Sequence, residues 1–331
     1  MLKNNAPSSK QRTEETVLGS NVPIKKFRRS APVQRPAHEE KRGAVKEQKV
    51  LSDRRTVQRT VPKKPREVRS TPVRFIPLGG LNEIGKNLYV YECSNDMFLA
   101  DCGLPFPDAE MPGVDLLVPD FTYLEKNKEH FRGIIITHGH EDHIGSIPYL
   151  LKKVNVPVYG TRLTLGLVEG KLREHGILAS SKLITVNPGE MVKMGCMSAE
   201  FIRVNHSIPD ACAIAVHTPV GVVVHTGDFK IDYTPIEGGI IDLARFGELG
   251  RKGVLALFSE STNAERPGYA MSERTVGSSF KNIFNQAEGR RIIVATFSSN
   301  IHRIQQIVDI AELQGRKVSV RCRSLLNFKQ K

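Results

Sequence analysis

Short apolar runs recur along the chain from Val73 onward, each closed by glycine or by polar residues, and they predict strands and helices joined by turns. Runs rich in β-branched residues predict strands within 73–93, 97–103, 132–140, 157–161, 182–186, 198–206, 212–228, 253–262, 290–299 and 317–322. Runs with apolar residues three or four positions apart predict helices within 144–154, 163–176, 272–289 and 300–315. Two strand segments are expected to fold back on themselves, at a glycine turn within 73–93 and at residues 219–221.

These elements divide the body of the chain into two parts. Up to about residue 245 strands outnumber helices, whereas from about residue 253 strands and helices alternate as they would in a parallel sheet. We therefore expect an α/β protein with one domain over 73–245 and part of a second domain over 246–331.

Residues 1–72 differ in composition, with Phe27 as their only aromatic residue and with Pro, Ser, Gln, Lys and Arg in place of large aliphatics. They carry 19 Lys and Arg against 7 Asp and Glu, while the remaining residues carry 29 against 28. Such a segment cannot bury enough apolar surface to offset its ordering entropy, so we expect a disordered basic arm. Two roles fit this arm equally: contact with the phosphates of RNA or ribosomes, and a solvated spacer.

The composition argues against a membrane or secreted protein. No window approaches 18 consecutive apolar residues, and the N-terminus lacks the apolar segment of a secretory signal. The five cysteines are scattered without a C-x-x-C pair, which is poor material for a disulfide framework or a zinc knuckle. We interpret them as reduced thiols of a cytoplasmic protein, and Cys102 as a small buried side chain rather than a site residue.

Candidate chemistry is concentrated in residues 134–151, IIITHGHEDHIGSIPYLL, where ligand-type side chains lie between two apolar runs. Imidazole suits zinc and similar ions, and carboxylate can add a second ion. His138 and His140 alternate on an extended segment and can hold one ion, while Asp142 and His143 fall on the next turn and can serve another. A polar turn between a strand and a helix would not need four such residues, so the motif predicts a two-metal site.

The spacing H-x-H-x-D-H after an apolar strand resembles the signature of the metallo-β-lactamase fold. In that fold's order the chain also offers Asp101 in LADCG, His206 in VNHSIPD and Asp228 in HTGDFKID. The resemblance spans residues 73 to about 245 and implies an αββα sandwich.

The same resemblance implies a role for each side chain. Six residues would hold two metal ions: His138, His140 and His206 the first, Asp142 and His143 the second, and Asp228 both. Asp101 would orient the ligand loop without holding a metal, and Glu141 would face away from the metals. A bridging water or hydroxide would be the nucleophile, and two zinc ions are expected, with manganese or magnesium as alternatives.

Segments beyond Asp228 resemble the β-CASP nucleases, a branch of this fold that cuts RNA or DNA. This likeness is carried by FSESTNAERPG and ATFSSNIHRIQQIVD, while FIPLGGLNEIGKN and HTGDFKIDYTPIEGG are similar to the ribonuclease J family. The resemblance covers nearly all of residues 73–320 and implies that the chain holds the start of a β-CASP α/β domain inserted in the sandwich. It implies 5′-to-3′ exonuclease and endonuclease activity on single-stranded RNA, in RNA processing and decay.

Three acids are expected to be catalytic: Asp142, Asp228 and Glu260. Glu260 matches an acidic β-CASP motif in which relatives more often carry aspartate, so its longer side chain changes its reach into the site. His217 and His225 lie in an apolar hairpin and are interpreted as structural, with His225 a candidate neighbour of the ligands.

Ser298, Ser299 and His302 lie where a strand gives way to a helix, and a helix N-terminus favours anions. We expect them to contact RNA phosphate. The alternatives are ordinary N-capping by residues 298–300 and a surface helix position for His302.

The chain ends earlier than the resemblance implies. The family carries a further metal-ligand histidine and a small C-terminal domain after the β-CASP insert, whereas this sequence has no histidine after His302 and ends VSVRCRSLLNFKQK. We therefore interpret the chain as truncated and expect weak or no nuclease activity, because the second metal would lack a ligand.

Two other functions stay open beside the ribonuclease. One is a thioester or lactone hydrolase of the same fold, which would not need the second α/β unit. The other is an inactive fragment that binds RNA through the basic arm, with salt-sensitive and metal-independent binding. The expected partners are RNA, with ribosomes or RNA-decay enzymes as further candidates, and a homo-oligomer is expected for the full-length family.

Overall fold

The computed structural model describes residues 71–108, 110–236 and 238–320. The predicted basic arm over 1–72 lies, except for its last two residues, outside this part. None of the described helices is long and apolar enough to cross a membrane.

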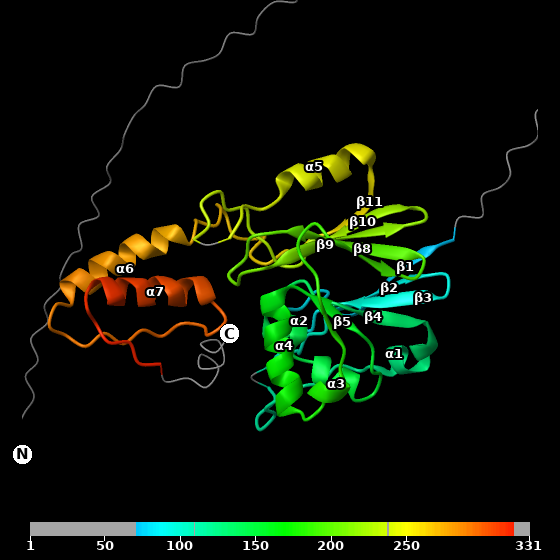
Figure 1. Cartoon of the computed structure of the whole chain (residues 1–331), viewed down its shortest axis with the longest axis horizontal. Helices are drawn as coiled ribbons and strands as arrows, with labels where there is room; N and C mark the ends of the chain where they lie inside the picture. Colours follow the sequence, from blue (N-terminus) through cyan, green and yellow to red (C-terminus); the bar gives the residue numbers. More distant parts are fainter. Residues whose placement is uncertain (1–70, 109, 237, 321–331) are drawn as a thin grey trace, which may run out of the picture. The chain divides into compact units, whose positions relative to one another are not determined.

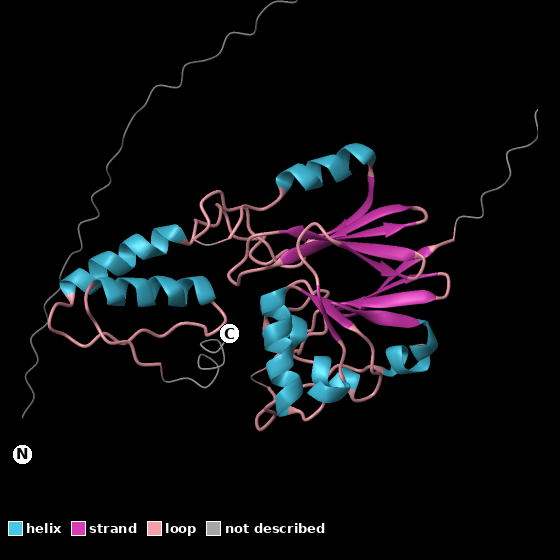
Figure 2. Cartoon of the chain, in the orientation of Figure 1, coloured by secondary structure: helices cyan, strands magenta, loops and turns pink. Residues whose placement is uncertain are grey.

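Two β-sheets packed against each other form the body of the described chain (Figure 1, Figure 2). The first has the order β1-β2-β3-β4-β5-β6, and the second the order β11-β10-β9-β8-β7. The strands of the first sheet are β1 (Val73–Gly79), β2 (Leu88–Cys93), β3 (Asp96–Ala100), β4 (Phe131–Ile135), β5 (Val158–Gly160) and β6 (Leu183–Thr185). Those of the second are β7 (Met191–Met194), β8 (Met197–Arg203), β9 (Cys212–Thr218), β10 (Gly221–His225) and β11 (Val254–Phe258).

The pairing of the strands follows the lengths of their connections. Strands β1, β2 and β3 are joined by short turns and pair antiparallel, whereas β3, β4, β5 and β6 pair parallel through helical crossovers. In the second sheet β7 to β10 form an antiparallel meander, and β11 returns through a helix to pair parallel with β10. Thr218 pairs with Gly221, which confirms the hairpin turn predicted at 219–221.

The helices fall into three groups according to what they pack against. The structure has α1 (Thr122–Lys126), α2 (Glu141–Ile144), α3 (Ile147–Leu151), α4 (Arg162–Glu174), α5 (Leu243–Lys252), α6 (Arg274–Gln286) and α7 (Ile301–Leu313), with short 3-10 turns at Lys128–His130 and Leu178–Ser180. Helices α1 to α4 pack on the first sheet, α5 packs on the second, and α6 and α7 pack on each other, each group around its own buried apolar cluster.

Alternation along β2 shows how the layers form. Leu88 and Val90 belong to the cluster beneath α1 to α4, while Tyr89 and Tyr91 belong to the cluster between the two sheets. Successive side chains of a strand point to opposite faces, so this one segment buries both of its faces. The order of layers is helix, sheet, sheet, helix, which confirms the αββα sandwich that the resemblance implied.

The second sheet also takes in a strand from beyond residue 245. Although β11 follows the predicted domain boundary, it pairs parallel with β10 as an edge strand of the sandwich. The division of the chain at 245 stays a prediction.

The predicted strand over 290–299 is wrong, and so is that part of 317–322 which the structure describes, residues 317–320. Ile293 and Phe297 are 88% and 82% exposed, and no strand of the described part pairs with this segment. A strand needs a neighbour for its hydrogen-bond ladder, so apolar β-branched residues alone do not make one.

The two helices that flank this segment pack on each other. Phe284 of α6 and Ile310 and Ala311 of α7 form a small buried cluster. Asn300 caps α7 by accepting a hydrogen bond from the backbone N–H of Arg303, at 3.1 Å. The N-capping alternative for residues 298–300 is therefore correct for Asn300.

A buried ion cluster ties α5 to the second sheet. Glu200 of β8 is 5% exposed and accepts hydrogen bonds from Arg245 Nε at 2.6 Å and Arg245 Nη2 at 3.0 Å. His217 of β9 lies 2.7 Å from the same carboxylate. Burial by itself raises the pKa of Glu200, but these partners outweigh it and hold the pKa below its ordinary value. The expected structural role of His217 agrees with this arrangement.

Replacing Glu200 by glutamine is expected to lower the free energy of unfolding at pH 7 by about 1–3 kcal/mol, because charged hydrogen bonds are lost. A depressed carboxyl pKa stabilises the fold above the unfolded pKa and loses this effect as the pH falls through the folded value. The difference in the free energy of unfolding between the E200Q and wild-type chains should therefore be constant near neutral pH and shrink below about pH 4. Urea unfolding at pH 7 and pH 3.5 measures it, with Glu248→Gln, at the exposed partner of Arg245, as the weaker control. A difference that grows toward acid pH would contradict the prediction.

Candidate metal centre

The predicted site residues come from four segments that follow β3, β4, β8 and β10. Asp101 follows β3, residues 137–143 follow β4, His206 follows β8 and Asp228 follows β10. β3 and β4 are parallel, and β8 and β10 both run antiparallel to β9, so the carboxyl ends meet at one end of the sandwich.

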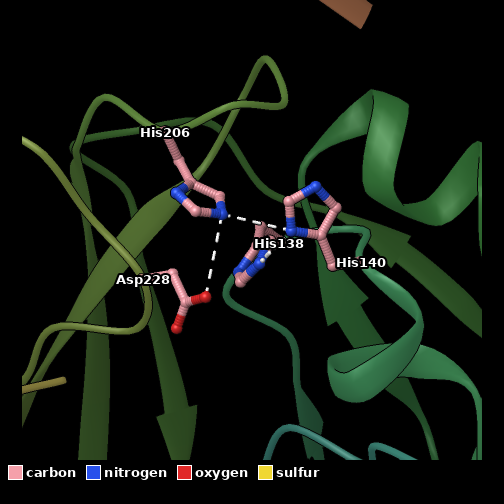
Figure 3. A group of neighbouring side chains, drawn as sticks. All are labelled: His138, His140, His206 and Asp228. Carbon is pink, nitrogen blue, oxygen red and sulfur yellow. Dashed lines mark hydrogen bonds and ion pairs between the residues drawn. The ribbon is translucent and has the colours of Figure 1, made fainter. Parts of the chain in front are cut away.

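Three imidazole rings and one carboxylate form the first group (Figure 3). His138 Nε2 and His206 Nε2 each lie 3.1 Å from His140 Nδ1, and His206 Nε2 lies 3.7 Å from Asp228 Oδ2. The four ligand atoms all lie within 4.8 Å of one another. Their number and their spacing suit one tetrahedral cation.

The protonation of this group also suits a cation. Burial lowers the pKa of all three histidines, that of His206 to about 3, so their ring nitrogens keep lone pairs at neutral pH. Burial by itself raises the pKa of Asp228, but the hydrogen bond from His143 outweighs it and the pKa falls to about 2. Neutral imidazole and ionised carboxylate are the forms in which these residues bind metal.

Asp142, His143 and Asp228 form the second group, again with ligand atoms within 4.8 Å of one another. His143 Nε2 lies 3.6 Å from Asp142 Oδ2 and 3.5 Å from Asp228 Oδ1. Asp228 thus turns one carboxylate oxygen toward His206 and the other toward His143. It is the one side chain that both groups share in the described part of the chain.

Asp101 holds the ligand loop from beneath. It is fully buried and accepts hydrogen bonds from the backbone N–H of Thr137 at 2.8 Å and from the Thr137 hydroxyl at 2.9 Å. His143 Nδ1 lies 2.8 Å from Asp101 Oδ2, so this nitrogen carries the hydrogen and Nε2 faces the second group. Burial by itself lowers the pKa of His143, but Asp101 and Asp228 outweigh it and raise the pKa well above its ordinary value, so a cation that binds Nε2 would displace the hydrogen from that nitrogen. The geometry agrees with the orienting role expected for Asp101.

Two residues of this network were missed by the sequence reasoning. The Thr137 hydroxyl bonds Asp101 and also lies 3.0 Å from His138 Nδ1 and 3.4 Å from His143 Nδ1, so it lies beside one residue of each group. Asn87, which precedes β2, lies 3.0 Å from His143 Nε2. In the sequence each of them is only a polar residue next to an apolar run, which Thr137 follows and Asn87 precedes.

Glu260 lies beside the second group without joining it. Its carboxylate accepts hydrogen bonds from the backbone N–H groups of Phe229 at 3.3 Å and Thr262 at 3.0 Å. Together with Asp142, His143 and Asp228 it lines a cavity of about 900 Å³. Its contacts brace the backbone next to Asp228, and its predicted catalytic role stays a prediction.

The three residues that were predicted to contact RNA phosphate differ in their burial. Ser298 and Ser299 are half-buried, and the backbone of Ser299, by a hydrogen bond to His140, opposes the lowering of that ring's pKa. His302 is buried, so a surface position on the helix is wrong for it. Contact of these three side chains with phosphate stays a prediction.

Other side chains lie as the sequence suggested. Cys102 is fully buried. Glu141 turns away from both groups and accepts a hydrogen bond from Lys171 Nζ at 2.7 Å. His225 is buried with Nδ1 3.3 Å from the Tyr91 hydroxyl and Nε2 4.0 Å from Asp101 Oδ2, so it lies beside Asp101.

Comparison with known families agrees with this architecture. A family model described as the metallo-beta-lactamase superfamily matches residues 82–249, and one described as the ribonuclease J beta-CASP domain matches residues 289–330. A solved structure from Enterococcus faecalis, described as a protein of unknown function, covers 76% of this chain and 72% of its own with a TM-score of 0.52. Its 16% sequence identity shows the fold alone.

Curated relatives are closer in sequence. Ribonuclease J of Synechocystis sp. is 50% identical over 77% of this chain, ribonuclease J of Thermus thermophilus 45% over 77%, and ribonuclease J2 of Bacillus subtilis 42% over 78%. The chain spans 40% of the length of the first and 46% of the other two. By the superfamily match over half its length, the chain belongs to the metallo-β-lactamase superfamily, and within it the chain is similar to proteins named ribonuclease J.

Proposed function

We propose that the chain binds two divalent cations and uses them to hydrolyse phosphodiester bonds of single-stranded RNA. The observation that supports this best is the position of Asp228, whose two carboxylate oxygens face two separate groups of donors. His138, His140 and His206 would hold the first cation with Asp228, and Asp142 and His143 the second with Asp228. When bound, such a pair lowers the pKa of a water molecule toward neutrality and withdraws charge from a phosphate.

The chain's own residues prepare the site for this chemistry. Asp101 accepts the hydrogen on Nδ1 of His143, so Nε2 is the ring nitrogen that would bind a cation. Thr137 and the backbone contacts of Glu260 fix the loops that carry the ligands. The cavity of about 900 Å³ lies directly against Asp142, His143 and Asp228, so a polymer can approach the second group from solvent.

RNA is proposed as the substrate because curated relatives at 42–50% identity are named ribonuclease J. We propose both 5′-to-3′ exonuclease and endonuclease modes, with Ser298, Ser299 and His302 as candidate phosphate contacts near the N-terminus of α7. The histidine-rich donor set favours zinc in the first group, while manganese or magnesium suits the carboxylate-rich second group. A cytoplasmic location, association with ribosomes or RNA-decay enzymes, and a homo-oligomer complete the proposal.

We also propose that turnover by this 331-residue chain is weak. Among the described residues the second group offers three side-chain donors, against four in the first. A cation with fewer protein ligands is held less tightly, and RNA cleavage needs both cations in place.

Single-turnover cleavage tests the proposal, with the complete 331-residue chain in excess over end-labelled single-stranded RNA. Slow cleavage that appears with Zn²⁺ or Mn²⁺ and disappears with EDTA is expected, because the proposed nucleophile forms only on bound cations. Asp142→Ala should abolish it, since that carboxylate belongs to the second group alone.

Three other outcomes have distinct meanings. Cleavage that survives EDTA or the D142A change would contradict the proposed site. Salt-sensitive RNA binding without any cleavage, lost on deletion of residues 1–72, would favour an RNA-binding function. Rapid degradation by the wild-type chain would overturn only the proposal of weak turnover.

A further inference from the structure

The loop between β1 and β2, residues 80–87, reaches the metal centre through its last residue, Asn87. The backbone N–H of Asn87 donates to the carbonyl oxygen of Asp142 at 3.1 Å, and the carbonyl of Asn87 accepts from the N–H of Gly103 at 3.0 Å. Gly103 has no room for a side chain, because an added Cβ would lie 1.5 Å from the Asp142 carbonyl oxygen. The loop that ends at Asn87, the segment around Gly103 and the helix that carries Asp142 are thus in direct contact.

The amide group of Asn87 adds three contacts at this point. Its nitrogen lies 3.1 Å from the carbonyl oxygen of Asp142, 3.3 Å from Asp142 Oδ2 and 3.0 Å from His143 Nε2. These three atoms belong to the two residues that the second group does not share with the first.

The orientation of this amide follows from its neighbours. The hydroxyl of Tyr89 lies 2.9 Å from Asn87 Oδ1 and can donate to it. A flipped amide would bring its oxygen against the carbonyl and carboxylate oxygens of Asp142, which are acceptors as well. The nitrogen therefore faces the metal centre and the oxygen faces Tyr89.

The number of hydrogens on the Asn87 amide determines which of its hydrogen bonds would remain when a cation binds. The NH₂ group has two hydrogens, and the two oxygens of Asp142 can accept both of them, whereas His143 Nε2 accepts only when it carries no hydrogen. Of the three, His143 Nε2 is the atom that a cation would take. Both hydrogens then remain for the two oxygens of Asp142.

We propose that Asn87 is a positioning residue for the second cation, because its amide group holds the carboxylate of Asp142 beside His143 Nε2. This inference rests on the proposed binding of two cations. The described contacts of the Asn87 side chain reach Asp142, His143 and Tyr89 and none of the four residues of the first group, so its effect should fall on one binding step.

The test is a titration of the metal-free, complete 331-residue chain with Zn²⁺, followed by calorimetry and by native mass spectrometry. The wild-type chain is expected to bind two ions in two steps. Asn87→Ala should weaken the second step about 10- to 100-fold, as loss of a residue that orients a ligand does. The first step should change less than about 3-fold, which also shows that the variant is folded.

Two further variants separate positioning from a general structural effect. Tyr89→Phe removes the hydroxyl that orients the amide and should weaken the second step by a smaller factor, with no added loss in the N87A background. Glu141→Gln is the matched control, because this neighbour of Asp142 turns toward Lys171, and neither step should change.

An unchanged second step in N87A, or equal losses in both steps, would overturn the inference while the two-cation proposal stands. If N87A binds neither ion, Y89F decides: selective weakening of the second step supports the inference, and any other result overturns it. A wild-type chain that binds a single ion overturns the two-cation proposal and this inference together.

Discussion

Replacing Asp228 by alanine is expected to abolish the second cation-binding step. The affinity of the first step should also fall, by more than the roughly 10- to 100-fold that is lost when a residue that only orients a ligand is removed. The reason is geometric, because Asp228 places one oxygen 3.7 Å from His206 Nε2 and the other 3.5 Å from His143 Nε2. Its loss removes one of four donors from the first group and one of three from the second. No other described residue belongs to both groups.

Thermal unfolding with and without Zn²⁺ measures this effect. A ligand that binds only the folded chain at 100 times its Kd stabilises that chain by about 2.7 kcal/mol, so the wild-type Tm should rise on addition of Zn²⁺. The D228A variant should show a much smaller rise. Asp228→Asn keeps the shape but not the charge, and should retain more of the first step than D228A. A Zn²⁺-dependent rise in Tm equal to that of the wild type would contradict the assignment of Asp228.

Replacing Asp101 by alanine is expected to destabilise the metal-free fold by about 3–5 kcal/mol, the range for removing one partner of a buried charged pair. Asp101 is fully buried, and its loss would leave the N–H of Thr137 and Nδ1 of His143 without their acceptor. The ring of His143 would also be free to carry its hydrogen on Nε2, so the second cation should bind more weakly. Urea unfolding of the metal-free chain gives the stability, and calorimetry with Zn²⁺ gives the binding.

The backbone at this position needs its own control. Asp101 has a φ of 59°, a left-handed conformation that alanine adopts at a cost of about 1–2 kcal/mol and glycine adopts freely. Asp101→Gly should therefore be less destabilised than D101A by about that amount, while Asp101→Asn, which tolerates this conformation and keeps an acceptor, should be the mildest. Equal stability of D101G and the wild-type chain would show that the carboxylate does not hold the loop.

Much of the fold could be predicted from the sequence. Alternating apolar residues marked nearly every strand of the sandwich, since each strand buries one or both faces regardless of its neighbours. The segment 290–299 shows where this fails. Its apolar, β-branched pattern is that of a strand, yet in the described chain it lacks a partner strand and is largely exposed. The helix predicted over 144–154 was correct in type but is broken at Gly145 and Ser146 into α2 and α3.

The candidate metal ligands could be named from the sequence, whereas most of the contacts that hold them in place could not. The candidate ligands His138, His140, Asp142 and His143 could be recognised because their spacing is local, set by one extended segment and one helical turn. A surface position was the alternative considered for His302 from its helix alone, whereas its burial depends on how α7 packs. Glu260 was identified as an acid of the site, but its hydrogen bonds to backbone N–H groups could not be foreseen.

By itself the sequence determined the identity of the metal-ligand candidates, the strands that carry them and the family to which the chain belongs. The tertiary structure decided which oxygen of Asp228 faces which group, which nitrogen of His143 is held by Asp101, and that Asn87 and Thr137 stand beside the ligands. The physical reason is the range of the interactions. Periodicity and motif spacing act over a few residues, whereas Asn87 and Asp142 are 55 positions apart and meet because β2 and β4 both pair with β3 in the sheet.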